Sequence, residues 1–176
     1  MAAPAGGALL SGIHVLVLTI SDGVASGHRM DESGAALAAR MVSLGAAVTR
    51  DHVADDAAAI GQRIGDAAAT HPLVLTTGGT GLTPRDVTPQ AARLVLDYEI
   101  PGFGEAMRAA GRATTPLADL SRSLAGVAGR SLVICVPGSP RGALESLAAI
   151  EPLLAHALET LAGPFEHGQP APLPVA

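Results

Sequence analysis

The sequence predicts an α/β fold in which helices cover both faces of a parallel sheet. Segments with strand character alternate with segments of helical character along the chain, which is typical of such sheets. The strand-like segments are apolar almost throughout, which indicates strands that are buried on both faces. The length of 176 residues fits a single domain with a sizeable core.

The first half of the chain supplies three predicted strands and two helices. The strands are expected over residues 14–20, 46–53 and 73–77, and a loop rich in Gly and Asp follows the first of them. The helices are expected over residues 36–45 and 56–71. Gly45 ends the first helix, and two internal glycines weaken the second.

The second half begins with a predicted helix in which Thr88 is the N-cap and Pro89 the first helical residue. A short helix is expected over residues 102–112 and a fourth core strand over 131–136. The final helix is expected over residues 143–163, where an internal proline at position 152 should kink or divide it.

The ends of the chain differ from the predicted domain of residues 13–163. Residues 1–12 are mostly small, and we expect them to be flexible, while residues 164–176 form a Pro-rich tail. The beginning of the chain lacks the positive segment of a signal peptide, and no apolar run reaches the roughly 18 residues that span a bilayer. We therefore expect a cytoplasmic protein with no membrane segment.

The composition excludes several classes of function. The net charge is −5 and the arginines are scattered, which argues against a nucleic-acid partner. The chain has no Lys, so a Walker-type phosphate loop and Schiff-base catalysis are both excluded. Its single cysteine, Cys135, lies in an apolar run, which favours a buried structural thiol over a nucleophile.

Glycines and hydroxyls follow the third predicted strand in the sequence TTGGTG, residues 76–81. The glycines allow a ligand to approach the backbone closely, and the N–H groups with the hydroxyls of Thr77 and Thr80 form a natural cradle for an anion. A tight turn between a strand and a helix is the alternative explanation. Ser139, which follows the fourth strand, is either a helix cap or a ligand hydroxyl.

Acidic residues are predicted at the same edge of the sheet. Asp86 follows the glycine-rich loop, and Asp55 and Asp56 follow the second strand. Each acid alone can be explained as a helix cap or a favourable contact with a helix dipole. Together, and next to an anion cradle, they match what Mg²⁺ prefers, which is one or two carboxylates, waters and the phosphate oxygens of a substrate.

Four motifs in order resemble the molybdopterin adenylyltransferase family, which includes Mog-type and MoaB-like proteins and the gephyrin G domain. They are TISDGVASGHRMDESG, LVLTTGGTGLTPRDVTPQA, IPGFGEAMR and PLADLSRSLAGVAGRSLVICVPGSPRGALESL. The resemblance covers roughly residues 13–163. It implies the molybdopterin-binding fold, a three-layer α/β/α domain with a mostly parallel central sheet. It also implies Mg-ATP-dependent adenylylation of molybdopterin, which gives adenylyl-molybdopterin and pyrophosphate.

The resemblance also assigns roles to residues of this chain. It implies that Asp55 and Asp86 are catalytic and hold Mg²⁺, although Ala54 replaces a proline that is usual in the family and leaves the choice between Asp55 and Asp56 open. The implied substrate and nucleotide contacts are Ser21, Asp22, Ser33, Gly34, Thr77, Gly78, Gly79, Thr80, Gly81, Gly138 and Ser139.

The resemblance leaves further points open. It implies a homotrimer, or a hexamer, and a molybdenum-insertion protein as a partner. A molybdopterin-binding carrier or scaffold without efficient adenylyl transfer is the alternative function, and it is less favoured because the acids are retained. A CinA-like nucleotide-processing relative is disfavoured by the PRDVTP motif.

Overall fold

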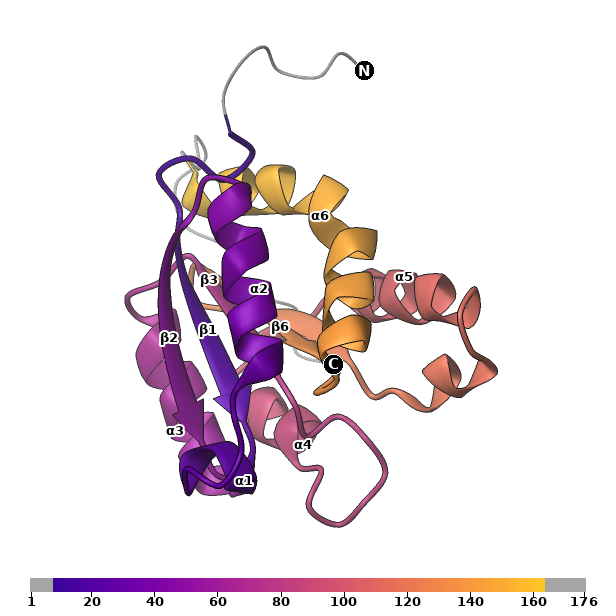
Figure 1. The fold of residues 1–176 in the computed structure, drawn as a ribbon. Coiled ribbons are helices and arrows are strands. Elements are labelled where there is room, and N and C mark those ends of the chain that lie inside the picture. Colours follow the sequence, from indigo (N-terminus) through magenta and orange to yellow (C-terminus); the bar gives the residue numbers. More distant parts are fainter. Residues whose placement is uncertain (1–7, 164–176) are drawn as a thin grey trace, which may run out of the picture.

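The computed structural model describes residues 8–163 and confirms the predicted α/β fold (Figure 1). Six strands form one mixed sheet in the order β2-β1-β3-β6-β5-β4. The strands are β1 (His14–Ile20), β2 (Ala47–Val53), β3 (Leu73–Thr77), β4 (Tyr98–Glu99), β5 (Leu124–Ala128) and β6 (Ser131–Val136). The helices are α1 (Asp22–Ala25), α2 (Glu32–Ser43), α3 (Ala57–Ala68), α4 (Thr88–Arg93), α5 (Pro101–Arg112), the 3₁₀ helix η1 (Pro116–Leu120) and α6 (Pro140–Ala162).

Parallel pairing brings four strand ends to one edge of the sheet. The β1 strand pairs in parallel with β2 and β3, and β3 pairs in parallel with β6. The loops that follow these four strands therefore lie at the same edge, as the sequence predicts, and this is where open α/β sheets bind ligands.

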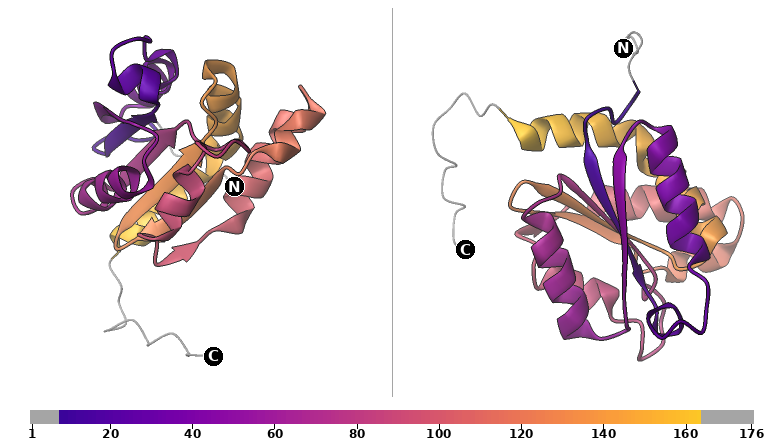
Figure 2. Two further views of the ribbon diagram at one scale, coloured as in Figure 1. Left: turned by 90° about the horizontal axis from the view of Figure 1, so that it is seen from below. Right: turned by 60° about the vertical axis from the view of Figure 1, so that its left-hand side comes forward.

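Helices lie on both faces of the sheet (Figure 2), and one apolar cluster fills the space between the sheet and the helices on each face. Alternate residues of β1 show the division: Val15 and Val17 pack with α2, α5 and α6, while Leu16 and Leu18 pack with α3 and α4. Among residues 8–163, the buried apolar side chains are mostly aliphatic, together with Met41, Met107, Cys135 and one phenylalanine, Phe103. This arrangement confirms the three layers.

Two strands were not predicted. The β5 strand runs antiparallel to β6, and β4 runs antiparallel to β5. Residues 124–128 read LAGVA, and Ala and Gly have weak strand propensity, so this segment carries no clear strand signal. The β4 strand has two residues, which is too short for a periodic pattern.

Two helix predictions need correction, and a third, that Pro152 kinks or divides the final helix, is confirmed. The α2 helix begins at Glu32, because the carboxylate of Asp31 caps it by accepting from the N–H of Gly34. Thr88 is not an N-cap: it lies inside α4, and its buried hydroxyl donates to the carbonyl of Gly78 at 2.9 Å. The α6 helix runs through Pro152 without a break, but it changes direction partway along (Figure 1), so it is kinked and not divided.

The prediction of a flexible N-terminal segment needs correction where the structure describes it. Leu10 is buried in the core, and its N–H donates to the carbonyl of Leu44 at 2.8 Å. Residues 1–7 and the predicted tail at 164–176 lie outside the described residues. Within residues 8–163, no helix is both long and apolar enough to cross a lipid bilayer.

Candidate active site

The loop after β3 has a backbone that requires glycine at two successive positions. Gly78 and Gly79 have φ angles of 106° and 62°, which side chains rarely adopt. A Cβ atom at Gly78 would lie 2.2 Å from the carbonyl oxygen of Ile20, and one at Gly79 would lie 2.2 Å from the hydroxyl oxygen of Thr88. The chain therefore folds tightly against the end of β1 and the start of α4.

The loop after β6 packs against this glycine pair. The hydroxyl of Thr77 donates to the carbonyl of Pro137 at 2.7 Å, and the N–H of Gly78 donates to the carbonyl of Val136. A Cβ atom at Gly138 would lie 3.1 Å from the Cα atom of Gly78. Because the hydroxyl hydrogen of Thr77 is used between the two loops, it is not available as the anion donor that the sequence predicts.

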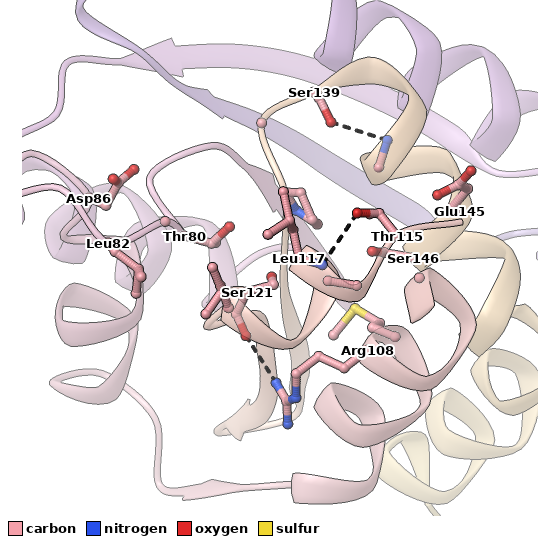
Figure 3. Close-up of a pocket in the computed structure, with 18 of the residues that line it drawn as sticks. Thr80, Leu82, Asp86, Arg108, Thr115, Leu117, Ser121, Ser139, Glu145 and Ser146 are labelled. Atoms are coloured by element: carbon pink, nitrogen blue, oxygen red, sulfur yellow. Dashed lines mark hydrogen bonds between the residues drawn. The ribbon is translucent and has the colours of Figure 1, made fainter. Parts of the chain in front are cut away.

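Two cavities lie on either side of these packed loops and share Gly79, Gly138 and Ser139 as lining residues. The larger cavity has a volume of about 500 Å³, and residues of the β3–α4 loop, α5, η1 and the start of α6 line it. In Figure 3, Thr80, Leu82 and Asp86 lie on one side of it, and Thr115, Glu145 and Ser146 lie on the other. The smaller cavity, of about 310 Å³, is lined by residues of β1, the first loop, the start of α2 and the glycine pair.

Asp86 lines the larger cavity and is held by its own loop. Its Oδ2 atom accepts from the N–H of Thr83 at 2.8 Å and from the Thr83 hydroxyl at 2.6 Å. Partial burial alone would raise the pKa of this carboxyl, but the two bonds from Thr83, the Gly81 backbone and the charge of Arg122 lower the pKa below its ordinary value. Asp86 is therefore a carboxylate at neutral pH.

Asp55 lies in a second network at the ends of β1 and β2. Its Oδ2 atom accepts from the N–H of Asp22, and the Oδ1 atom of Asp22 accepts from the N–H of Asp55. The guanidinium of Arg85 forms an ion pair with Asp22. The hydrogen bond from Asp55, followed by that from Arg85, lowers the pKa of the Asp22 carboxyl. Arg85 thus links the loop that carries Asp86 to the loops that carry Asp22 and Asp55.

Asp31 fixes the start of α2 beside the smaller cavity. Its carboxylate accepts from the Thr19 hydroxyl and from the N–H of Gly34, and it forms an ion pair with Arg50. Burial alone would raise the pKa of this carboxyl, but these hydrogen bonds lower it overall. A Cβ atom at Gly34 would lie 2.3 Å from the Thr19 hydroxyl oxygen, so the close packing requires a glycine in this turn.

The structure separates the predicted contact residues into three groups. Ser21, Ser33, Thr77 and Gly78 line the smaller cavity; Thr80, Gly81 and Asp86 line the larger one; and Gly79, Gly138 and Ser139 line both. Asp22, Gly34 and Asp55 line neither of the two cavities.

Ser139 and Asp56 both cap helices, whereas Asp55 does not. Ser139 caps α6 by accepting from the N–H of Gly142 at 3.2 Å, and it also lines both cavities. Asp56 caps α3 by accepting from the N–H of Ala59. The helix-cap explanation therefore accounts for Asp56, whereas the carboxylate of Asp55 bonds across to the loop after β1.

Sequence reasoning missed several polar residues of the cavities. Arg29 and Asp31 line the smaller cavity, and Arg108, Ser121 and Glu145 line the larger one. Within the part of the chain that the structure describes, the guanidinium of Arg29 has no hydrogen-bond or ion-pair partner. These residues stand inside the motifs that carry the family resemblance, but their spacing gives no separate signal for a site.

Cys135 is fully buried, as predicted. Burial raises the pKa of its thiol to about 11, so the thiol is neutral and unreactive near pH 7. Cys135 is therefore part of the core and not of the site.

The acids at this edge fit Mg²⁺ that arrives with a phosphate substrate better than a resident metal centre. Among residues 8–163, no three His, Cys, Asp or Glu side chains come together as a preformed metal site. Mg²⁺ bound with a nucleotide needs only one or two protein carboxylates. Asp86 is ionised and lines a cavity, so it meets this requirement.

Comparisons with known proteins identify the family. Residues 16–156 match the family described as "Probable molybdopterin binding domain". A molybdenum cofactor biosynthesis bifunctional protein of Synechococcus elongatus is 42% identical over 161 residues, which are 90% of this chain and 50% of that protein. The chain thus spans half the length of this relative.

Two further relatives are matched over most of their own length. A molybdopterin adenylyltransferase of Helicobacter pylori strain J99 is 35% identical over 158 residues, which are 87% of this chain and 90% of that protein. The crystal structure of the molybdopterin biosynthesis enzyme MoaB from Thermus thermophilus has a TM-score of 0.79 and 43% identity, and the match covers 88% of this chain and 99% of that chain. This chain therefore belongs to the molybdopterin-binding domain family.

Proposed function

We propose that this chain is an enzyme of molybdenum cofactor biosynthesis that transfers AMP from ATP to molybdopterin. A phosphate oxygen of molybdopterin forms a bond to the α-phosphorus of ATP, and the bond from that phosphorus to the β-phosphate oxygen breaks. The products are adenylyl-molybdopterin and pyrophosphate. Two relatives at 35% and 34% identity that are named molybdopterin adenylyltransferase support this reaction class.

The observation that carries the proposal is the wall shared by two cavities. The reaction needs two substrates whose phosphates meet, and the two cavities have volumes of about 500 and 310 Å³, which are within or near the usual range for ligand pockets. They meet at Gly79, Gly138 and Ser139. This wall places backbone groups close to both cavities, so it suits two phosphates that must come together in line.

The larger cavity suits a ligand that has both a ring and polar substituents. Leu82, Met107 and Leu117 provide apolar surface, and hydroxyls such as those of Thr80 and Ser121 provide hydrogen-bonding groups. The lining contains one arginine, Arg108, and two acids, Asp86 and Glu145. We propose that one substrate lies in this cavity and that the other lies in the smaller cavity, with Arg29 among its phosphate contacts.

We propose that Asp86 holds the magnesium ion and that Asp55 is the second acid of the site. The ion supplies charge neutralisation at the reacting phosphates when it is bound. The protein orients the phosphates with the glycine-loop backbone and keeps Asp86 deprotonated through Thr83. Because a phosphate nucleophile is already anionic near neutral pH, the reaction needs no strong general base.

The assembly and location of the protein are part of the same proposal. We propose that the chain acts in the cytoplasm as a homotrimer or hexamer and passes its product to a molybdenum-insertion protein. Sedimentation at micromolar concentration tests the oligomer, and a monomer would contradict it.

The reaction is tested by incubating the protein with molybdopterin, ATP and Mg²⁺ and measuring adenylyl-molybdopterin and pyrophosphate. The proposal expects equal amounts of the two products, and it expects neither product when EDTA is present. Tight binding of molybdopterin without either product would instead support a carrier or scaffold function.

A further inference from the structure

The loop that carries Asp86 is exposed and has little packing of its own. Leu82 has 64% of its surface exposed, and Thr83, Pro84 and Arg85 are also exposed. Within the loop, the N–H of Asp86 donates to the carbonyl of Thr83, and the Asp86 carboxylate accepts back from the same residue. These bonds close a turn, but they do not fix the turn relative to the larger cavity.

Arg122 joins this turn to β5 and α4, while the Arg85–Asp22 ion pair joins it to the loop after β1. Its Nε atom donates to the carbonyl of Gly81 at 2.8 Å, and its Nη2 atom donates to the carbonyl of Asp86. Its Nη1 atom donates to the side-chain oxygen of Gln90 at 3.0 Å, in the first turn of α4. One guanidinium therefore contacts both ends of the Asp86 turn and the helix that follows it.

Arg122 is itself held in place. Its N–H donates to the carbonyl of Thr80 at 3.0 Å. The guanidinium of Arg108 donates to the carbonyls of Ser121 and Ser123 on either side of it, at 3.4 and 3.1 Å. The β5 strand begins immediately after these residues, so the Arg122 fork is anchored to the sheet.

The geometry requires arginine and not simply a positive charge. Arginine presents five N–H donors in a rigid planar fork, whereas lysine is a point charge on a flexible stem. Three acceptors in different directions, at Gly81, Asp86 and Gln90, match the fork. A lysine at this position could satisfy only some of them.

We propose that Arg122 is a positioning residue that holds the Asp86 turn at the wall of the larger cavity. It lies outside the cavity lining, and its contacts with this turn are to backbone carbonyls, so it acts through Asp86 and not on a substrate. The part of this inference that concerns catalysis rests on the proposed adenylyl transfer. The part that concerns the loop stands on the contacts alone.

The loop is tested by hydrogen exchange in the wild type, Arg122→Gln and Arg122→Lys. We expect the amides of residues 80–90 to exchange about tenfold faster or more in Arg122→Gln. The reason is that the free energy of local opening of this loop falls by at least the net contribution of one hydrogen bond. The matched control is Arg93→Gln, which removes an exposed ion pair with Glu99 from the same α4 helix and should leave these amides unchanged. Unchanged exchange at residues 80–90 in both Arg122 variants overturns the proposal.

The catalytic part is tested by steady-state AMP transfer with the same variants. We expect kcat to fall about 10²-fold in Arg122→Gln, while KM for both substrates changes by less than about threefold, because the acid is misplaced and the cavities remain. Arg122→Lys should recover only a small part of kcat, and Arg93→Gln should match the wild type. Full recovery of kcat by lysine overturns the proposal, because charge and not the fork would then be sufficient.

The two tests separate the possible failures. If the wild type transfers no AMP, the proposed function fails, and hydrogen exchange still decides whether Arg122 holds the loop. If the wild type is active and Arg122→Gln keeps its kcat, the positioning role fails and the proposed function stands.

Discussion

Asp22 and Asp55 each donate a backbone N–H to the carboxylate of the other, with N–O distances of 2.8 and 3.0 Å. This reciprocal pair joins the loop after β1 to the loop after β2. Arg85 extends it through an ion pair to the loop after β3. The ends of three parallel strands are therefore connected, although the two aspartates are 33 positions apart in the chain.

The reciprocal pair predicts different roles for the neighbouring acids Asp55 and Asp56. Asp55→Asn keeps an oxygen that can accept from Asp22 but loses the charge, so we expect a normal melting temperature and a kcat at least about tenfold lower. Asp56→Asn is the control, because asparagine caps a helix as well as aspartate, and it should change neither quantity. If Asp56→Asn lowers kcat and Asp55→Asn does not, the functional acid is Asp56.

The glycine pair predicts a specific cost for a methyl group at position 79. Gly79 and Gly129 have nearly equal φ angles of 62° and 60°, but only the Cβ at position 79 would meet an atom, the Thr88 hydroxyl oxygen at 2.2 Å. Both alanine variants should lose about 1–2 kcal/mol from backbone strain, and Gly79→Ala should lose more. Urea unfolding measures the difference, and equal losses would contradict the close approach seen here.

The buried hydroxyl of Thr88 predicts an order of stability among substitutions at this position that differs from the order expected for a helix cap. Thr88→Val leaves the carbonyl of Gly78 without its partner and should cost about 1–3 kcal/mol. Thr88→Ser keeps the bond and should cost less, whereas Thr88→Asn, a good helix cap, should not rescue stability because the site is fully buried. Wild-type stability of the asparagine variant in thermal unfolding would restore the cap interpretation.

The lowered pKa of Asp31 predicts a loss of stability in acid. A carboxyl whose pKa is lower in the folded state than in the unfolded state stabilises the fold above the unfolded pKa, and the contribution is lost as the pH falls through the folded pKa. At pH 7, Asp31→Asn should be about 1 kcal/mol less stable than the wild type, because the charged bond to Arg50 is lost. The difference should shrink below about pH 4, as measured by urea unfolding at several pH values. A difference that stays constant down to about pH 2 would contradict this account.

Local patterns explain which parts of the fold could be predicted. The β1, β3 and β6 strands consist mostly of apolar residues, so the sequence indicates both their positions and their burial. The β5 strand was missed because Ala and Gly make up much of it, and it becomes a strand by pairing with β6. The α2 helix begins at Glu32, before the apolar pattern that indicates it, because the carboxylate of Asp31 caps it.

Local patterns also decide which residues of the site could be predicted. The glycine-rich loop could be predicted because its glycines follow β3 directly, and Asp86 because an acid lies in the same loop before α4. Arg122 could not, because its partner Asp86 is 36 positions away and nothing in the residues around Arg122 indicates the contact. Thr88 was misjudged because a Thr-Pro pair also matches a helix start, and only the folded loop brings the Gly78 carbonyl to its hydroxyl.

The most direct test of the central claim is a single-turnover measurement of AMP transfer to molybdopterin by the wild type and by Asp86→Asn. Asparagine keeps an oxygen for the Thr83 bonds but has no charge, so molybdopterin binding and the melting temperature should be preserved. The account predicts stoichiometric adenylyl-molybdopterin from the wild type and a rate about 10²-fold lower from the variant. An equal rate in the two proteins, with binding unchanged, would contradict it.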